Sequence, residues 1–416
     1  MRLLIYLLFG LSLIACSKDK DSAQQSNFKR KADDFPPCQA AQLKQQFLVV
    51  WKDGSISREY AVDRESFIND FMEENKEYIE FAENDYLVEF PPVGKDADVN
   101  LSAIDNWGVA RIAADQAWQM GARGQNITVA VVDSGVDVNH PDLSQQIAHN
   151  ENEIPGNGID DDGNGYIDDY SGYSYITHDD DVAQSSLHGS HVSGIIAAQH
   201  DDNEIMQDKV QGIAPRAKLI PLKFIDADGG GLVSDAIDAI DYAVLRGAKV
   251  INASWGGGCS ESLKVKMDQL TSEDVLFIAA AGNSAKNIDK DPEFPAAYAT
   301  AAMITVGAIT RFNGMADFSN YGDKRVHLFA PGESIISTAP GNRYISLDGT
   351  SMAAPFVSGA AAALWSDQPQ ASAQQIKQAL LEAVDIEYDN NNIPTYHNVT
   401  QGRLNLGRAI EILRNL

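Results

Sequence analysis

Apolar runs recur along the last three quarters of the chain, and stretches with helical periodicity separate several of them. The continuous runs cover residues 127–132, 218–225, 249–253, 275–280 and 303–309. Runs of β-branched and other apolar residues are typical of strands that are buried on both faces of a sheet. Between two of these runs, Ile237, Ile240 and Val244 lie on one face of a helical stretch. The alternation predicts an α/β fold with a central, mostly parallel sheet covered by helices.

A smaller unit precedes this pattern. Residues 47–51 and 78–90 have strand patterns, residues 66–78 have a helical one, and Pro91 and Pro92 end the second strand. An α+β unit of about fifty residues buries little surface and is marginal by itself. We therefore expect it to depend on the larger unit that follows.

The first residues have the pattern of a targeting segment. Residues 3–15 are almost wholly apolar and follow Arg2, but the run is shorter than the ~20 residues that span a bilayer. It ends in Leu13-Ile14-Ala15-Cys16, which resembles the lipobox of bacterial lipoproteins. The likeness implies a lipid on Cys16 that holds the protein at the bacterial cell envelope, at the outer membrane or the surface. An ordinary signal peptide with an incidental cysteine is the alternative.

Composition excludes some classes of protein. The 416 residues include 59 Asp and Glu against 32 Lys and Arg, for a net charge of −27, so a general nucleic-acid binder is excluded by charge repulsion. Three cysteines cannot build a disulfide scaffold. Cys38 and Cys259 form a bridge or remain thiols, and the sequence leaves both open.

Polar or glycine-rich turns follow the predicted strands. Asp133 follows the first run, and Asn283 follows the run over residues 275–280. Ligands bind at the carboxyl ends of parallel strands, so these turns are candidate site residues. Taken singly, Asp133 could be a helix cap and His188 a structural histidine. Together with Ser351 they supply a nucleophile, a base, an orienting acid and an amide donor.

Four motifs carry a resemblance to a known family. They are VAVVDSGVD (129–137), HGSHVSG (188–194), AAAGN (279–283) and GTSMAAP (349–355). In this order they resemble the subtilisin-like serine peptidases, or subtilases, over residues 106–413. Ser190 and Ser193 replace the usual Thr and Ala of the histidine motif. The resemblance implies a subtilisin-like three-layer fold and a monomeric serine endopeptidase that acts on proteins or peptides.

The resemblance also implies a role for each site residue. Ser351 would be the nucleophile, His188 its base and Asp133 the acid that orients the imidazole, while Asn283 and the Ser351 N–H would stabilise the oxyanion. The implied substrate-binding positions are Gly229, Gly230, Gly231, Leu232, Ser254, Trp255, Gly256, Gly257, Ala281 and Gly282. The segments 254–257 and 280–283 offer no charge, so we expect an apolar or aromatic side chain before the scissile bond.

Two other classes of function remain as alternatives. One is a catalytically inactive binding protein on the same fold. The other is an esterase or lipase, although Ser351 lies outside the Gly-x-Ser-x-Gly elbow of those enzymes.

Residues 78–90 resemble the end of a subtilase inhibitory propeptide. By that likeness the N-terminal unit assists folding and blocks the cleft until it is cleaved, whereas the alternative is an accessory domain that stays attached. Cleavage would release the mature enzyme from the lipid on Cys16 unless the two parts stay joined. The expected parts are a signal peptide (1–15), a polar tether (16–38), a propeptide (39–95) and a catalytic domain (96–416).

Residues 151–181 contain ten Asp or Glu and no Lys or Arg. Within them the spacing of an EF-hand-type calcium loop recurs at Asp160, Asp162, Asn164, Tyr166 and Asp168. Ser171 stands at position 12, where such loops have a bidentate Glu. By resemblance Asp142 is a second calcium ligand, although the loop near residues 200–208 that would complete its site is altered. We expect structural calcium, and the alternative is a solvated acidic loop.

Overall fold

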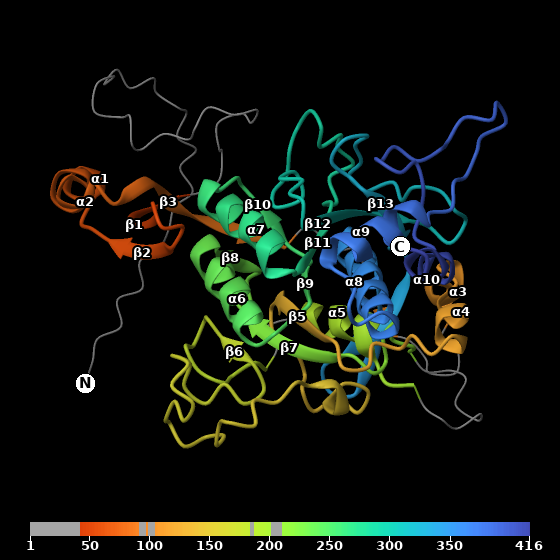
Figure 1. The fold of residues 1–416 in the computed structure, drawn as a ribbon, viewed down its shortest axis with the longest axis horizontal. Coiled ribbons are helices and arrows are strands. Elements are labelled where there is room, and N and C mark those ends of the chain that lie inside the picture. Colours follow the sequence, from red (N-terminus) through yellow and green to blue (C-terminus); the bar gives the residue numbers. More distant parts are fainter. Residues whose placement is uncertain (1–41, 91–96, 99–104, 184–186, 201–209) are drawn as a thin grey trace.

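The computed structural model describes residues 42–90, 97–98, 105–183, 187–200 and 210–416 (Figure 1). The predicted signal peptide, tether and lipid site at Cys16 lie outside the described residues, as do Cys38 and most of the loop expected near Asp142. In the described part of the chain, no helix is both long and apolar enough to cross a bilayer.

The largest described sheet has seven strands in the order β13-β12-β11-β9-β5-β7-β6, and all of its pairings are parallel. Each of the five predicted runs contains one of these strands, which confirms the predicted parallel sheet. The strands are β5 (Thr128–Asp133), β6 (Tyr173–Ser174), β7 (Lys218–Lys223), β9 (Val250–Ala253), β11 (Leu276–Ala280), β12 (Met303–Ile309) and β13 (Leu328–Pro331). The sequence did not predict β6 and β13, which are short.

Helices cover both faces of this sheet, which gives the three-layer α/β fold (Figure 1). Because side chains alternate along a strand, Val129 and Val131 of β5 face one core and Ala130 and Val132 face the other. The first core contains α5 (His188–Ala197) and α8 (Thr350–Asp367), and the second contains α6 (Val233–Leu245) and α7 (Glu261–Glu273).

Shorter elements complete this unit. The helices are α3 (Trp107–Arg111), α4 (Ala114–Gln119), η3 (Ser144–Gln146), α9 (Ala373–Glu382) and α10 (Leu406–Leu413). An antiparallel sheet contains β14 (Ile335–Ala339), β15 (Arg343–Leu347) and β4 (Ala97–Asp98).

The N-terminal unit is a small antiparallel sheet with one helical segment. Its strands are β1 (Gln42–Trp51), β2 (Ile56–Tyr60) and β3 (Ile79–Glu89), and β1 pairs with both of the others. The helical segment contains α1 (Arg64–Ser66), η1 (Phe67–Met72) and α2 (Glu73–Asn75). Its separate core includes stacked Phe47 and Phe67. The two predicted strands and the helix between them are present, with the helix starting and ending slightly earlier, and β2 is an additional strand that the sequence did not predict.

Candidate active site

Asp133 and His188 form a buried pair at the carboxyl end of the sheet. Asp133 is the last residue of β5 and His188 is the first of α5. The Nδ1 atom of His188 lies 2.9 and 3.0 Å from the two carboxylate oxygens of Asp133. A Cβ atom on Gly189 would lie 2.2 Å from the Gly135 carbonyl oxygen, so glycine permits this close approach. The pair can therefore hold one tautomer of the imidazole, with Nδ1–H donating to Asp133.

Ser351 lies where β9 and α8 meet. It is the second residue of α8 and is fully buried. Its hydroxyl donates to the Ser254 carbonyl at 3.1 Å, and the Ser254 hydroxyl donates to the Ser351 carbonyl at 2.9 Å. The positive end of the helix dipole lies at this serine and favours negative charge beside it.

Asn283 is fixed in the turn after β11. Its Oδ1 atom accepts hydrogen bonds from the Thr350 backbone N–H and the Thr350 hydroxyl, both at 2.8 Å. These two bonds fix which end of the amide is oxygen. The Nδ2 atom lies beside the backbone before Ser351, since a Cβ atom on Gly349 would come within 3.2 Å of it. Asn283 can therefore donate beside the serine.

An extended strand occupies the two predicted substrate edges. Strand β3 pairs antiparallel with β8 (Gly230–Leu232) on one side and with β10 (Gly256–Gly257) on the other. The Phe90 N–H donates to the Gly229 carbonyl at 3.2 Å, and the Phe90 ring lies 4.2 Å from the His188 ring between centroids. The end of the N-terminal unit therefore runs between the edges and reaches His188.

Two buried carboxylates of β3, which the sequence did not predict as contacts, anchor it to the larger unit. Glu83 accepts hydrogen bonds from the Ser260 hydroxyl at 2.6 Å and from backbone N–H groups of residues 261 and 262, at the start of α7. Asp85 accepts from the Ser234 N–H at 3.1 Å, at the start of α6. Burial raises the pKa of both groups. The strand has four acids, Glu80, Glu83, Asp85 and Glu89, and nothing in its sequence separates the two that are buried from the other two.

A cavity of about 340 Å³ lies beside the strand edges. It is lined, as predicted, by Trp255, Gly256, Gly257 and residues 280–282. Its lining also includes Glu293 and Phe294, so the expectation of a pocket without charge was wrong. This could not be predicted from the sequence, because Glu293 lies ten residues beyond Asn283 and reaches the cavity only through the fold.

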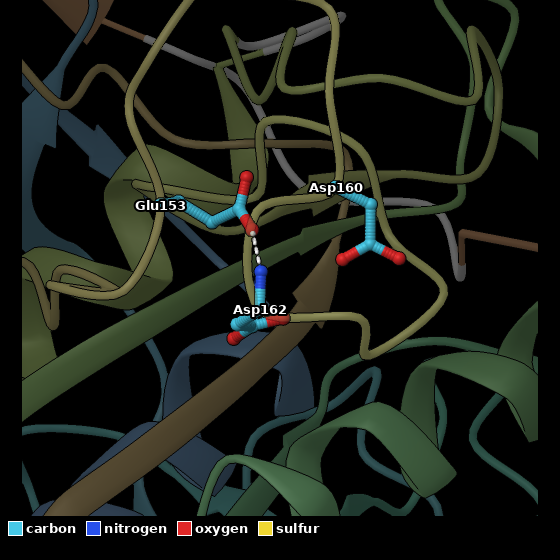
Figure 2. Close-up of side chains that lie close together, drawn as sticks. All are labelled: Glu153, Asp160 and Asp162. Carbon is cyan, nitrogen blue, oxygen red and sulfur yellow. Dashed lines mark hydrogen bonds between the residues drawn. The ribbon is translucent and has the colours of Figure 1, made fainter.

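The acidic insert brings together two of the predicted calcium ligands. Ligand atoms of Glu153, Asp160 and Asp162 all lie within 4.8 Å of one another (Figure 2). Glu153, which the sequence did not predict as a ligand, is 4% exposed, and its Oε2 atom has no hydrogen-bond partner within the described residues. Asn164 is held beside the cluster, because its N–H donates to both Asp160 and Asp162. This donor set is one that calcium prefers.

Two predicted calcium ligands lie outside this cluster. The carboxylate of Asp168 accepts from the Asn157 and Gly158 N–H groups at 2.9 and 2.8 Å. The carboxylate of Asp142 accepts from the Tyr344 hydroxyl at 2.6 Å.

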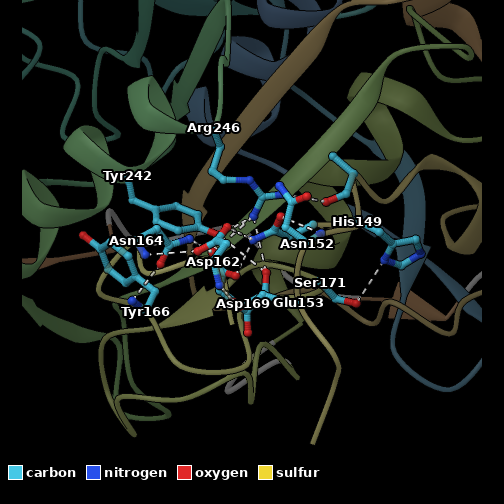
Figure 3. Close-up of polar contacts among 12 residues, drawn as sticks. His149, Asn152, Glu153, Asp162, Asn164, Tyr166, Asp169, Ser171, Tyr242 and Arg246 are labelled. Carbon is cyan, nitrogen blue, oxygen red and sulfur yellow. Dashed lines mark hydrogen bonds and ion pairs between the residues drawn. The ribbon is translucent and has the colours of Figure 1, made fainter. Parts of the chain in front are cut away.

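Buried Asp169 instead joins the insert to α6 (Figure 3). It accepts from Asn150 at 2.6 Å and Asn164 at 3.0 Å, and from Tyr242 and Arg246 of the α6 region.

Cys259 lies shortly after β10 and is disulfide-bonded. The other two cysteines, Cys16 and Cys38, lie outside the described residues.

Comparison with known proteins defines the class of this chain. Residues 124–403 match the model of the Subtilase family. Several relatives of at least 30% identity are covered over more than two thirds of their own length. The chain therefore belongs to the subtilase family of serine endopeptidases.

Three relatives illustrate the extent of the likeness. The Thermophilic serine proteinase of Bacillus sp. (strain AK1) is 34% identical over 314 residues, 75% of this chain and 69% of the relative. The Major intracellular serine protease of Bacillus subtilis is 35% identical over 276 residues, 65% of this chain and 78% of the relative. The Thermostable alkaline protease of Halalkalibacterium halodurans is 30% identical over 355 residues, 83% of this chain and 88% of the relative. A match of that length is longer than residues 106–416, so it includes part of the N-terminal unit.

Proposed function

We propose that this subtilase hydrolyses peptide bonds through Asp133, His188 and Ser351. The observation that carries the proposal is the placement of β3, an extended peptide that pairs on both sides and leads directly to His188. A substrate that adds to the same two edges would arrive in the same way.

Each residue has a definite task in this mechanism. The Ser351 hydroxyl turns from the Ser254 carbonyl toward the substrate and attacks the scissile carbonyl, while His188 Nε2 takes its proton. Asp133 stabilises the imidazolium that forms. Asn283 Nδ2 and the Ser351 N–H stabilise the negative oxygen of the tetrahedral intermediate. His188 then gives the proton to the leaving amine. A water molecule, with His188 again taking a proton, attacks the acyl group on Ser351 and releases it.

Casein hydrolysis by purified protein tests the proposal. After self-processing and treatment with dithiothreitol to break the disulfide of Cys259, we expect wild type to hydrolyse casein and to react with a fluorophosphonate probe, and the Ser351→Ala variant to do neither. Equal casein hydrolysis by the two proteins would reject Ser351 as the nucleophile. Ester cleavage without casein cleavage would favour an esterase, and no reaction in either assay would favour an inactive binding protein.

We propose that the N-terminal unit is an inhibitory propeptide, and that self-cleavage between Phe90 and Asn106 cuts the backbone that joins it to the catalytic domain. Its strand β3 occupies the substrate edges, so the uncleaved chain cannot accept another substrate there. Buried Glu83 and Asp85 add contacts that are specific to this unit. The alignment with the Halalkalibacterium relative also reaches into it.

We propose that a lipid on Cys16 holds the protein at a bacterial cell envelope, on the basis of the lipobox. Membrane fractions of cells that express wild type should contain the protein. A Cys16→Ser variant should move to the soluble fraction, and membrane retention of that variant would oppose the assignment.

We propose that the acidic insert binds a structural Ca²⁺ through Glu153, Asp160 and Asp162, with Asn164 beside them. The buried Oε2 atom of Glu153 supports a cation here, because an unpartnered buried carboxylate oxygen is costly. Glu153 would supply the carboxylate that Ser171 lacks at position 12. Bound calcium would neutralise the cluster and stiffen the connection to α6 through Asp169.

Thermal unfolding tests this calcium site. In the Ser351→Ala background, EDTA should lower Tm by roughly 5 °C, the size expected for a ligand near a hundredfold above its Kd. Glu153→Gln should remove most of that response. The matched control is Glu151→Gln, because Glu151 is an exposed glutamate of the same insert. A Tm that is insensitive to EDTA, or an undiminished response in Glu153→Gln, would contradict the proposal.

A further inference from the structure

The cavity beside the substrate edges contains a carboxylate that is held in place. The Phe294 backbone pairs with Gly257, with the Gly257 N–H donating to the Phe294 carbonyl at 2.7 Å, so residues 293–294 form one wall. The Oε2 atom of Glu293 accepts from the Nδ2 of buried Asn320 at 2.8 Å. A Cβ atom on Gly282 would lie 2.1 Å from that same oxygen, so the carboxylate contacts the turn that carries Asn283.

The charge of Glu293 is only partly compensated. Among the described residues, its ion-pair partner is Lys286, whose Nζ lies 3.4 Å from Glu293 Oε1 and 3.1 Å from Asp291 Oδ2. One cation is therefore shared between two carboxylates, which leaves a net negative charge. The side chain of Glu293 is 27% exposed, so it is accessible from the cavity.

The rest of the lining suits the stem of a long cationic side chain. Trp255, Phe294, Ala280 and Ala296 contribute apolar surface to the cavity. Lysine and arginine place their methylene stems along such surfaces and extend their charged ends to a polar partner.

We propose that Glu293 makes this peptidase select substrates with Lys or Arg before the scissile bond. This inference rests on the proposed function, and it replaces the apolar preference expected from the sequence. Glu293 is a specificity residue that contacts the substrate side chain and takes no part in proton transfer.

Four peptide p-nitroanilides of the form succinyl-Ala-Ala-Pro-X, with X as Lys, Arg, Phe or Glu, test this specificity in the self-processed protein after dithiothreitol has broken the disulfide of Cys259. We expect wild type to show a kcat/KM at least about tenfold higher for Lys and Arg than for Phe. Glu293→Gln should lower the Lys-to-Phe ratio by about tenfold, through loss of a charge-assisted contact. Asp317→Asn is the matched control, because Asp317 is an exposed acid that, among the described residues, neither lines the cavity nor pairs with Lys286.

A wild-type preference for Phe would overturn the proposal, as would a ratio that is unchanged in Glu293→Gln. Failure of wild type to cleave any of the four peptides would instead reject the proposed function, and this inference with it.

A second, independent observation concerns the disulfide of Cys259. This residue is 4% exposed and lies next to Ser260, whose hydroxyl donates to Glu83 of the N-terminal unit. Cys259 is disulfide-bonded, and the chain has only two other cysteines, Cys16 and Cys38. Both precede β1, so either partner joins the catalytic domain to the N-terminal side of the proposed cleavage.

We infer that this disulfide keeps the cleaved propeptide attached to the enzyme, an inference that rests on the proposed self-cleavage. We assign its partner to Cys38, because the proposed thioether to lipid would occupy the sulfur of Cys16. The tether would keep the inhibitory strand at an effective concentration near millimolar for a short flexible link. It would also keep the processed enzyme on the lipid of Cys16, although the backbone is cut.

Intact mass and membrane fractionation with and without dithiothreitol test the tether. Two thiols of dithiothreitol become its own disulfide and give two protein thiols, so the processed protein should separate into two chains only after reduction. Cys259→Ser should release the catalytic domain to the soluble fraction without reductant, and Cys38→Ser should do the same.

Release of the catalytic domain from unreduced wild type would overturn the inference. If the chain is never cut, thiol alkylation still tests for the disulfide. Alkylation of Cys259 without prior reduction would show that the bond is absent. Absence of cleavage by itself would reject self-processing and not the disulfide.

Discussion

At the scale of single residues, the site depends on polar groups whose partners fix their orientation. Ser190, which stands where the family usually has Thr, accepts a hydrogen bond from the Asp137 N–H at 2.8 Å, and its carbonyl accepts from the Thr338 hydroxyl at 2.7 Å. It therefore joins the turn after β5 to α5 and β14. A hydroxyl is retained at this position, so the departure from the family pattern preserves the geometry of Asp133 and His188.

Asn283→Ala should lower kcat by about 10² to 10³ with a small change in KM, because the donor acts mainly on the transition state. This magnitude is the one measured for an oxyanion-hole Asn of subtilisin, transferred to this chain. Steady-state kinetics on a peptide substrate provide the measurement. A kcat within threefold of wild type would remove Asn283 from the oxyanion site.

The site residues whose roles could be predicted from the sequence are those that lie within the four motifs. Local pattern fixes the place of each: Asp133 ends a strand, His188 and Ser351 begin helices, and Asn283 lies in the turn after a strand. Glu293 and Glu153 could not be predicted in their roles, because their neighbours come from distant or irregular segments. Asp168 is a residue that the motif predicted in the wrong role. Its spacing fits a calcium loop, but its carboxylate accepts hydrogen bonds from backbone N–H groups.

At the scale of elements, β3 joins the two units by capping helices. The carboxylate of Glu83 satisfies N–H groups at the start of α7, which otherwise have no partner within the helix. These caps add to the short pairings of β3 with β8 and β10 and to the ion pairs of Arg58 with Asp235 and Asp238. The predicted strand over residues 78–90 gave the position of β3 but not its pairing, which depends on the other unit.

Glu83→Ala in the Ser351→Ala background should loosen β3. Loss of a buried carboxylate that accepts three hydrogen bonds costs about 1–3 kcal/mol, so hydrogen exchange of β3 amides should accelerate by about tenfold or more. Glu77→Ala is the control, because Glu77 is exposed just before β3. Equal protection of β3 in the two variants would show that the caps do not hold the unit in place.

At the scale of the whole molecule, the parallel sheet could be predicted from apolar runs, whereas the acidic insert has no periodicity from which to derive its fold. Part of the charge of −27 lies in that insert, where Asn150, Tyr242 and Arg246 donate to Asp169.

The interior also contains two neutral histidines. Burial lowers the pKa of His191 and of His327 to about 3, and the Thr305 N–H donates to His327 Nδ1 at 2.9 Å.

These histidines predict acid destabilisation. The unfolded chain binds a proton on each histidine below about pH 6.5, while the folded chain does not until near pH 3. The free energy of unfolding should therefore fall as pH decreases through that window. In urea unfolding of the Ser351→Ala protein, His327→Asn should reduce the loss between pH 6.5 and 5 by roughly 2 kcal/mol. Parallel pH profiles for the two proteins would contradict a neutral His327.

Intact masses of wild type and of the Ser351→Ala protein show whether Ser351 cuts the chain that contains it. After reduction, wild type should give two chains that divide between Phe90 and Asn106, and the Ser351→Ala protein should remain a single chain. The same cut in both proteins, or an uncut wild type, would rule out self-cleavage by Ser351.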